Sequence, residues 1–304
     1  MNGLPSRRQA LALIAAGALP RLASAQPTQP APLRVVASFS LLADMVAVVG
    51  GDAVTVHALV GPDADAHAFT PAPADAQRLA QAELIVVNGL GFEGWIDRLV
   101  RASGSKAPVL VASQGITVRH VGKVVDPHAW QSLVAAQHYV DNIRAALVAI
   151  LAIRQPAQAA AINVRAAAYT RQLAALDTSV RARLASIPAG QRKLVTSHDA
   201  FGYLADVWGL DMRAAQGWTS AGEASAADVA RLIRQLRAQR VRALFVENIS
   251  DPRLVQRIAH EAGATLGGTL YSDALSPPGG RADSYLKLMA HNADTLLAAL
   301  QPER

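Results

Sequence analysis

The chain has 304 residues, of which 51% are apolar and 17% are charged, and it contains no cysteine. This composition excludes a disordered, solvating chain, and the length allows two lobes or one large domain with a sizeable core. The lack of cysteine excludes disulfide frameworks, thiolate zinc sites, iron–sulfur clusters, cysteine nucleophiles and the acylated cysteine of a bacterial lipoprotein.

The N-terminal segment has the pattern of an export signal. Arg7 and Arg8 precede an apolar stretch over residues 10–20, and the small residues 23–25 offer a cleavage site before Gln26. This stretch is too short to span a bilayer as a helix, which needs about 20 residues. We therefore expect residues 1–25 to be the signal peptide of a periplasmic protein. The export route is either the general secretory one or the twin-arginine one, because residues 6–11 resemble a twin-arginine signal.

The formal net charge of +6 depends partly on three arginines of this leader. Without them, 26 basic residues face 23 acidic ones, which leaves a net charge of +3. The remaining basic residues are scattered, and Arg231, Arg234 and Arg237 follow one another at a spacing typical of a solvated helix face. We therefore expect no nucleic-acid partner.

Apolar runs alternate with amphipathic ones in two series, a pattern typical of β-α units and parallel sheets. The first series predicts strands at 33–38, 54–60, 84–87 and 109–111, and helices at 41–49, 73–81 and 93–102. The second predicts strands at 194–196, 212–215, 243–246 and 265–270, and helices at 200–207, 226–239, 252–261 and 282–300.

A long helical tract, residues 129–187, lies between the two series and is interrupted at Pro156. Residues 157–184 contain neither Gly nor Pro, so a helix of about 28 residues, roughly 40 Å long, can form there. We predict an α/β fold with two β-α lobes, residues 26–155 and 188–304, joined by a linking helix over residues 156–187.

Three of the eight histidines, His67, His128 and His198, lie in loops that enter a helix, and Asp273 lies at a fourth junction of this kind. In α/β folds, ligands bind in loops at the carboxyl ends of strands. Only a fold that brings the two lobes face to face can unite these residues. Three imidazoles and one carboxylate would then form a tetrahedral set suited to zinc. Each histidine alone could instead be structural, and Asp273 could cap a helix.

Two other motifs suggest chemistry that their context argues against. Residues 89–94 match the G-x-G-x-x-G pattern of dinucleotide-binding turns, but the acidic residue expected about 20 positions later is missing, which favours a plain tight turn. His260 and Glu261 begin like a zinc-protease helix, but Ala264 stands where the second histidine must be.

Two further residues are predicted to lie near the site. Glu247 follows a predicted strand and is a candidate to orient a ligand imidazole, although it could equally contact the start of the next helix. Trp130 follows His128 closely enough to form part of the wall of the site.

Four segments resemble those of the zinc- and manganese-binding solute-binding proteins of ABC importers: HAFTPAPAD, DPHAW, SHDAFGYLADVWGL and VENISDPRLVQRIAHEAGATLGGTLYSDALS. The resemblance covers most of residues 33–300 in the same order. It implies two β-α lobes joined by a rigid long helix, with a metal in the cleft between them. By motif matching, the metal ligands fall on His67, His128, His198 and Asp273.

The chain departs from the family pattern at a few loop positions. Ala66 stands where the family often has Pro, and Thr70 where it has Glu. After DPHAW the chain reads Gln131-Ser132-Leu133 instead of the usual leucine and acidic residue. These changes concern the geometry of the loops more than the identity of the ligands.

The resemblance implies a receptor, not an enzyme: a monomer that binds Zn²⁺ and delivers it to an ABC permease in the inner membrane. His198 stands where manganese-leaning members often have Glu, which favours zinc, although residues 119–125 lack the His/Asp-rich loop of many zinc-importing members. A receptor for Mn²⁺ is the nearest alternative. A periplasmic zinc hydrolase would need an open coordination position, which a fourth ligand at Asp273 removes.

Overall fold

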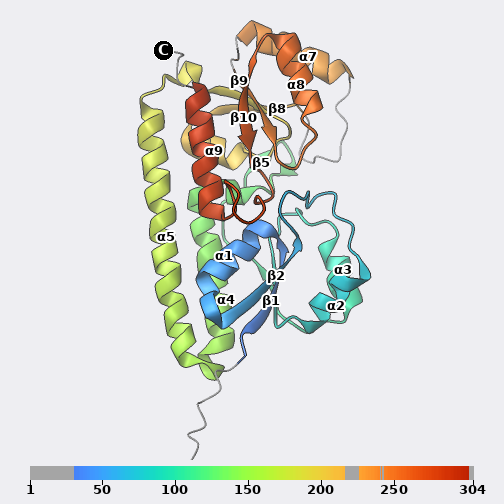
Figure 1. The fold of residues 1–304 in the computed structure, drawn as a ribbon, viewed down its shortest axis with the longest axis vertical. Coiled ribbons are helices and arrows are strands. Elements are labelled where there is room, and N and C mark those ends of the chain that lie inside the picture. Colours follow the sequence, from blue (N-terminus) through green and yellow to red (C-terminus); the bar gives the residue numbers. More distant parts are fainter. Residues whose placement is uncertain (1–30, 216–225, 240, 242, 301–304) are drawn as a thin grey trace, which may run out of the picture. The chain divides into compact units, whose positions relative to one another are not determined.

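Two parallel four-stranded sheets form the framework of the computed structural model, which describes residues 31–215, 226–239, 241 and 243–300 (Figure 1). The first sheet has the strand order β2-β1-β3-β4, and every neighbouring pair in it is parallel. Its strands are β1 (Leu33–Phe39), β2 (Val54–Val60), β3 (Leu84–Val87) and β4 (Val109–Val111). The helices of this N-terminal lobe are α1 (Ser40–Gly50), α2 (Pro73–Gln81) and α3 (Ile96–Ser103).

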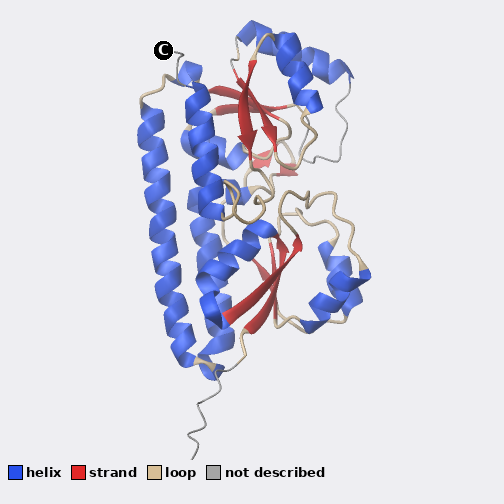
Figure 2. Cartoon of the chain, viewed as in Figure 1, coloured by secondary structure: helices blue, strands red, loops and turns tan. Residues whose placement is uncertain are grey.

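The second sheet forms the C-terminal lobe and has the strand order β10-β9-β7-β8, again with all pairs parallel (Figure 2). Its strands are β7 (Lys193–Thr196), β8 (Asp211–Ala214), β9 (Ala243–Glu247) and β10 (Thr265–Leu270). The helices are α6 (Gly202–Trp208), α7 (Ala226–Gln239), α8 (Arg253–Ala262) and α9 (Tyr285–Leu300). The predicted α/β class with two parallel-sheet lobes is therefore confirmed.

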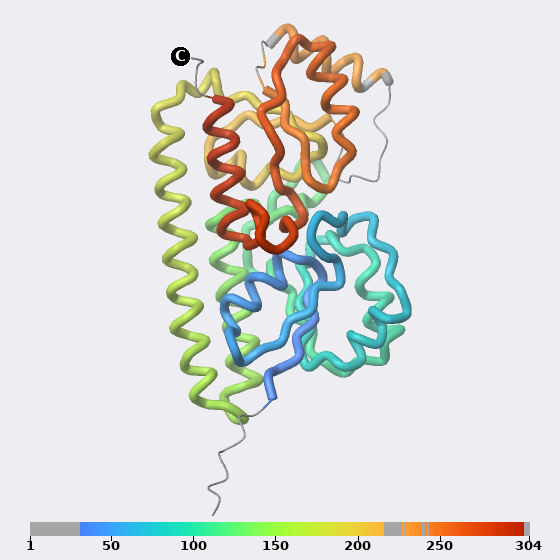
Figure 3. The backbone as a smooth tube through the Cα atoms, viewed as in Figure 1, coloured from blue at the N-terminus to red at the C-terminus, as the bar shows by residue number. Residues whose placement is uncertain are grey.

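Two long helices connect the lobes: α4 (Leu133–Arg154) and α5 (Pro156–Ala185) lie side by side and are separated only by Gln155 (Figure 3). Pro156 is the first residue of α5, where its missing N–H leaves no hydrogen bond unmade. The buried residues of α5 recur every three or four positions and give one continuous packing face: Ala159, Ile162, Ala166, Tyr169, Leu173, Asp177, Val180 and Leu184. This face packs on α4, α1, α9 and α6, so the linking helix contacts both lobes.

Polar contacts also fasten α5 to both lobes. Arg165 donates to the carbonyls of Val49 and Gly50, the last residues of α1, at 2.9 and 2.6 Å. These carbonyls have no partner within α1, so the guanidinium acts as a cap. Near the other end of α5, the buried carboxylate of Asp177 accepts a hydrogen bond from Trp208 Nε1 of α6 at 3.1 Å. Residues 32–304 form one unit by contact, and the predicted limits of the lobes stay a prediction.

Several predicted helix starts were wrong by two to four residues, because side chains reshape the turn before the helix. Residues Ala129–Gln131 form a short 3-10 helix, and α4 starts only at Leu133, where the Ser132 hydroxyl accepts from the amide of Ala135. Similarly, α9 starts at Tyr285 and not at residue 282, whose amide donates to the side chain of Ser276.

The sequence also gave no prediction for the hairpin of β5 (His120–Val121) and β6 (Val124–Val125), which turns at Gly122 with a positive φ of 60°. The predicted signal peptide, residues 1–25, lies outside the described residues. No helix in the described part of the chain combines the length and the apolar character that a bilayer crossing requires.

Candidate metal site

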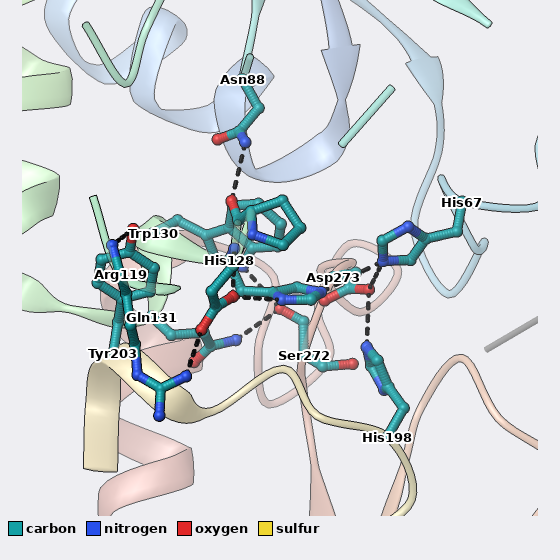
Figure 4. A network of polar contacts seen from close by, with 12 residues as sticks. His67, Asn88, Arg119, His128, Trp130, Gln131, His198, Tyr203, Ser272 and Asp273 are labelled. Carbon is teal, nitrogen blue, oxygen red and sulfur yellow. Dashed lines mark hydrogen bonds and ion pairs between the residues drawn. The ribbon is translucent and has the colours of Figure 1, made fainter. Parts of the chain in front are cut away.

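The fold brings the four residues singled out by the sequence to one point. His67 lies between β2 and α2, His128 between β6 and α4, His198 between β7 and α6, and Asp273 between β10 and α9. Each offers one nitrogen or oxygen atom, and these four atoms all lie within 4.8 Å of one another. Figure 4 shows the side chains of His67, His198 and Asp273 converging from different loops. Loops of both lobes therefore contribute to one cluster.

The spacing of the atoms suits a small cation. His67 Nε2 lies 3.2 Å from His128 Nε2. Asp273 Oδ2 lies 3.3 Å from His67 Nε2 and 3.2 Å from His198 Nε2. A tetrahedral ion with bonds of about 2.0–2.1 Å separates its ligand atoms by about 3.3–3.4 Å. These three separations are therefore close to the edges of such a tetrahedron.

The cluster is almost completely shielded from solvent. His128, His198 and Asp273 are fully buried, and the side chain of His67 is 5% exposed. Among the described residues, Asp273 Oδ1 has no hydrogen-bond partner. A buried carboxylate oxygen without a partner is costly, and a bound cation would offset that cost. The donor set thus fits a metal ion both by its geometry and by its buried carboxylate oxygen without a partner.

The electrostatics of the cluster keep its carboxylate ionised. Burial raises the pKa of Asp273, but the charge and the hydrogen bond of His198 and the hydrogen bond of His67 outweigh burial and hold that pKa well below its usual range. Burial lowers the pKa of His198, whereas the carboxylates of Glu247 and Asp273 outweigh burial and raise that pKa well above its usual value. The site therefore favours a positive charge between its carboxylates, which a metal cation can supply in place of a proton.

Two acidic side chains orient the buried imidazoles. Glu247, the last residue of β9, accepts a hydrogen bond from the amide of His198 at 2.8 Å, and its second oxygen lies 2.6 Å from His198 Nδ1. Asp126 Oδ1 accepts from the amide of His128 at 3.0 Å and lies 2.9 Å from His128 Nδ1. Each carboxylate holds Nδ1, so the Nε2 atom of each ring faces the cluster. The sequence suggested Glu247 but not Asp126, although an aspartate two residues before a histidine is the spacing of an Asx turn.

Aromatic rings form one wall of the cluster. The ring centroid of Phe92 lies 4.6 Å from that of His67, and the centroid of Trp130 lies 5.3 Å from that of His128. Phe92 and Trp130 also contact each other, with centroids 4.6 Å apart. Trp130 was predicted at this wall, whereas Phe92 was not.

Phe92 comes from the G-x-G-x-x-G segment, and the structure explains that motif as a turn. The carboxylate of Glu93 accepts hydrogen bonds from the amides of Asn88 and Gly89 at 2.6 and 3.2 Å. These amides would have to point at a phosphate in a dinucleotide site. Because Glu93 belongs to this turn, α3 begins at Ile96 and not at residue 93 as predicted.

The loop that carries Asp273 is bound to the N-terminal lobe on both sides of that residue. The carbonyl of Ser272 accepts from Trp130 Nε1 at 2.9 Å and from Gln131 Nε2 at 2.7 Å. The amide of Leu275 donates to the hydroxyl of Ser40 at 3.0 Å, and its carbonyl accepts from the amide of residue 63 at 2.9 Å. Asp273 follows a strand of the C-terminal lobe, but contacts with the N-terminal lobe position its loop.

The sequence as a whole matches a known family. Residues 35–299 match the family described as "ZnuA: Zinc-uptake complex component A periplasmic". The chain belongs to this family. It is accordingly a metal-binding solute-binding protein of the ABC-transporter type, and the ZnuA family consists of receptors.

Curated relatives with similar sequences carry the names of different metals. "Iron-binding protein YfeA" of Yersinia pestis is 32% identical over 268 residues, which cover 86% of this chain and 85% of that protein. "Zinc-binding protein TroA" of Treponema pallidum is 31% identical, and the match covers 88% of this chain and 88% of that protein. "Manganese-binding lipoprotein MntA" of Bacillus subtilis (strain 168) is 30% identical and covers 88% of this chain and 90% of its own length.

Solved structures agree with this assignment. The periplasmic zinc-binding protein TroA of Treponema pallidum superposes with a TM-score of 0.83 at 30% identity, over 89% of this chain and 100% of that one. The Mn-bound periplasmic metal binding protein of Candidatus Liberibacter asiaticus gives a TM-score of 0.78 at 28% identity, over 88% and 100%. Membership of the family therefore shows that the chain is a metal receptor, while the members differ in the metal for which they are named.

Proposed function

We propose that this protein is a periplasmic receptor that binds one Zn²⁺ ion and delivers it to an ABC permease in the inner membrane. The observation that carries the proposal is the buried cluster of His67, His128, His198 and Asp273, whose four donor atoms lie within 4.8 Å of one another. We assign these four residues as the metal ligands. The protein acts as a monomer, since one chain supplies the whole set.

The donor set favours zinc over manganese. Three neutral imidazoles and one carboxylate suit a borderline-soft cation, and most such sites bind Zn²⁺ more tightly than Mn²⁺. The three short separations between donor atoms also suit the small tetrahedral ion. Mn²⁺ is the second candidate, and the names of the manganese-binding relatives favour it.

Glu247 supports binding without touching the ion. Its carboxylate contacts both the amide and Nδ1 of His198, so it holds the imidazole with Nε2 toward the cluster. Four protein ligands fill a tetrahedral ion and leave no position for an activated water, so the arrangement favours capture and transfer over catalysis. Release must then come from a movement of the ligand-bearing loops.

Metal analysis of the purified mature protein tests the proposal. After removal of metals with a chelator, we expect the uptake of one Zn²⁺ per chain, and competition at equal free ion concentrations should favour Zn²⁺ over Mn²⁺. A preference for Mn²⁺ would change the proposed ion but would leave the proposed receptor role intact. If the protein took up neither ion stoichiometrically, the proposed receptor role would be refuted.

A pair of histidine variants tests the ligands. His198→Ala should weaken zinc binding at least 100-fold, because it removes one of four ligands. His138→Ala is the matched control, since His138 is exposed on α4 and lies outside the cluster; it should bind zinc like the parent. Equal zinc affinity of His198→Ala and the parent would contradict the assignment.

A further inference from the structure

Arg119 joins the two lobes directly behind the cluster. It belongs to the segment between β4 and β5 of the N-terminal lobe, and its backbone amide donates to the hydroxyl of Tyr203 at 2.8 Å. Its guanidinium lies between two carboxylates: Nη1 donates to Asp126 Oδ2 at 3.0 Å, and Nε donates to Asp206 Oδ2 at 2.9 Å. Tyr203 and Asp206 both belong to α6, the helix that follows the His198 loop. Arg119 therefore contacts α6 at two points, Tyr203 and Asp206, and binds Asp126 of its own lobe. Figure 4 shows Arg119 beside Tyr203.

The inner end of this chain of contacts reaches His128. Asp126 uses Oδ1 for the amide and Nδ1 of His128 and uses Oδ2 for Arg119. A carboxylate bound at both oxygens has little freedom to rotate, and charge-assisted hydrogen bonds of this kind are among the stronger ones. Arg119 therefore fixes the carboxylate that in turn fixes the imidazole.

Gly202, the first residue of α6, shows how closely the helix lies against this ion pair. A Cβ atom at position 202 would lie 2.2 Å from Arg119 Nη1 and 2.7 Å from Asp126 Oδ2. Only glycine lets the backbone of the helix approach so closely. The backbone of α6 thus lies against the guanidinium and Asp126, and a side chain at this position would have to displace one or both of them.

The two ends of the chain of contacts differ in exposure. Asp126 is fully buried, whereas the side chain of Asp206 is 64% exposed. Asp206, Arg119 and Tyr203 line an open cavity of about 530 Å³ that also borders α4 and α5. The buried contact is shielded from salt and water, while the exposed contact is screened and weaker. The contact with Asp126 therefore holds the Arg119 guanidinium more strongly than the contact with Asp206 does.

We infer that Arg119 is a positioning residue through which α6 of the C-terminal lobe holds His128 of the N-terminal lobe in its metal-binding orientation. The inference rests on the proposed function for its consequence, because the orientation of His128 matters only if this imidazole binds the ion. It gives the two lobes a mechanical connection: when α6 moves away, the support of His128 is lost together with His198.

Zinc affinity, measured by competition with a chromogenic chelator, tests the connection. Arg119→Gln and Gly202→Ala should each weaken binding about 10-fold, the lower end of the range for groups that orient a metal ligand. Asp206→Asn changes only the exposed contact and should weaken binding about 2-fold to 3-fold. Arg183→Gln is the matched control, because Arg183 also pairs with an aspartate of another helix, Asp294, at 2.7 Å, and neither residue belongs to the cluster. This variant should bind zinc like the parent.

A double substitution separates positioning from a general loss of structure. If Arg119 acts through Asp126, then Arg119→Gln should have no further effect on zinc affinity in a chain that already carries Asp126→Asn. Independent effects that multiply, or parent-like affinity of both Arg119→Gln and Gly202→Ala, would overturn the inference. Asp206 is exposed, so Asp206→Asn should leave the fold intact. This variant can therefore test the inference even if Gly202→Ala does not fold.

A measurement without metal keeps this inference distinct from the proposed function. In the metal-free protein, the NMR signals of the His128 imidazole should differ between the parent and Arg119→Gln, because the ring loses its fixed orientation in the variant. An unchanged His128 spectrum in that variant would contradict the inference whether or not the protein binds zinc. Absent zinc uptake by the parent would refute only the proposed function.

Discussion

The indole Nε1 of Trp130 donates a hydrogen bond to the backbone carbonyl of Ser272, which is 142 residues further along the chain, at 2.9 Å. Trp130 lies two residues after His128, and Ser272 lies one residue before Asp273. This hydrogen bond therefore helps to connect the loops of two proposed ligands from different lobes.

Trp130→Phe should weaken zinc binding several-fold and lower the free energy of unfolding by about 1–2 kcal/mol, because it removes this bond from a buried site. The loss is limited, since Gln131 still donates to the Ser272 carbonyl. Asn142→Ala is the control: it also removes side-chain hydrogen bonds to backbone carbonyls, those of Ala112 and Gln114, and none of these residues belongs to the cluster. Chelator competition and urea unfolding should show both variants destabilised and only Trp130→Phe impaired in binding.

Glu247→Gln should reduce zinc affinity about 10-fold to 100-fold, the usual range when a group that orients a ligand histidine is altered. The amide has the same size, but it loses the charge that faces His198 Nδ1 at 2.6 Å. Glu83→Gln, which neutralises a more exposed carboxylate paired with Arg154, should bind zinc like the parent. Isothermal titration of both variants checks this, and equal affinities would show that Glu247 has no part in binding.

Asp44 should make stability depend on pH. Burial is the main reason that its pKa rises to about 6, with the charge of Asp283 adding to it, although the carboxylate accepts the amide of Tyr285 at 2.8 Å. The folded protein therefore holds this proton more tightly than the unfolded chain does. Stability falls as pH rises from about 4 to about 6, and the cost of the buried charge persists above that.

Asp44→Asn should remove this cost, because asparagine stays neutral and can still accept the amide of Tyr285. At pH 8 we expect the variant to be more stable than the parent by about 1–2 kcal/mol, discounted for partial exposure, and the difference should vanish below pH 4. Asp141→Asn, at an exposed position on α4, should change stability by only a few tenths of a kcal/mol. Urea unfolding across this pH range would reject the prediction if Asp44→Asn gave a pH-independent difference.

Arg165→Met should lower the free energy of unfolding by about 2 kcal/mol, since it leaves two carbonyls at the end of α1 without their donor. The apolar stem of the side chain is retained. Arg171→Met, at an exposed position of the same helix, should be nearly neutral. Neither change should alter zinc affinity, so a loss of binding in Arg165→Met would indicate that α5 influences the cluster directly.

The elements that were predicted well from the sequence are those whose hydrophobic periodicity and terminating residues agree. The bounds of β2, α2, β3, β4, α7 and β10 agree with the prediction, because Gly, Pro or a change of period marks their ends. The starts of α3, α4 and α9 could not be predicted, since Glu93, Ser132 and Ser276 bind backbone amides there. Such caps depend on the geometry of the turn and not on the pattern of the helix.

The four clustered residues were predictable from their shared position in loops that enter helices, together with the family resemblance. Their surroundings were not. Phe92 contacts His67, and Arg119 contacts Asp126, from segments that no spacing in the sequence connects. Asp126 was missed although its position two residues before His128 has the spacing of an Asx turn. Gly202 is informative only once the position of Arg119 is known.

The loop around Asp273 has a consequence for how the ion would leave. Trp130, Gln131 and Ser40 of the N-terminal lobe bind its backbone on both sides of the carboxylate. A separation of the lobes that preserves these bonds carries Asp273 with His67 and His128 and withdraws only His198, which is held by Glu247 in the other sheet. The ion would then lose the bond of His198 while His128 loses the support of α6, and an incoming donor atom could take the ion over at the vacant coordination position.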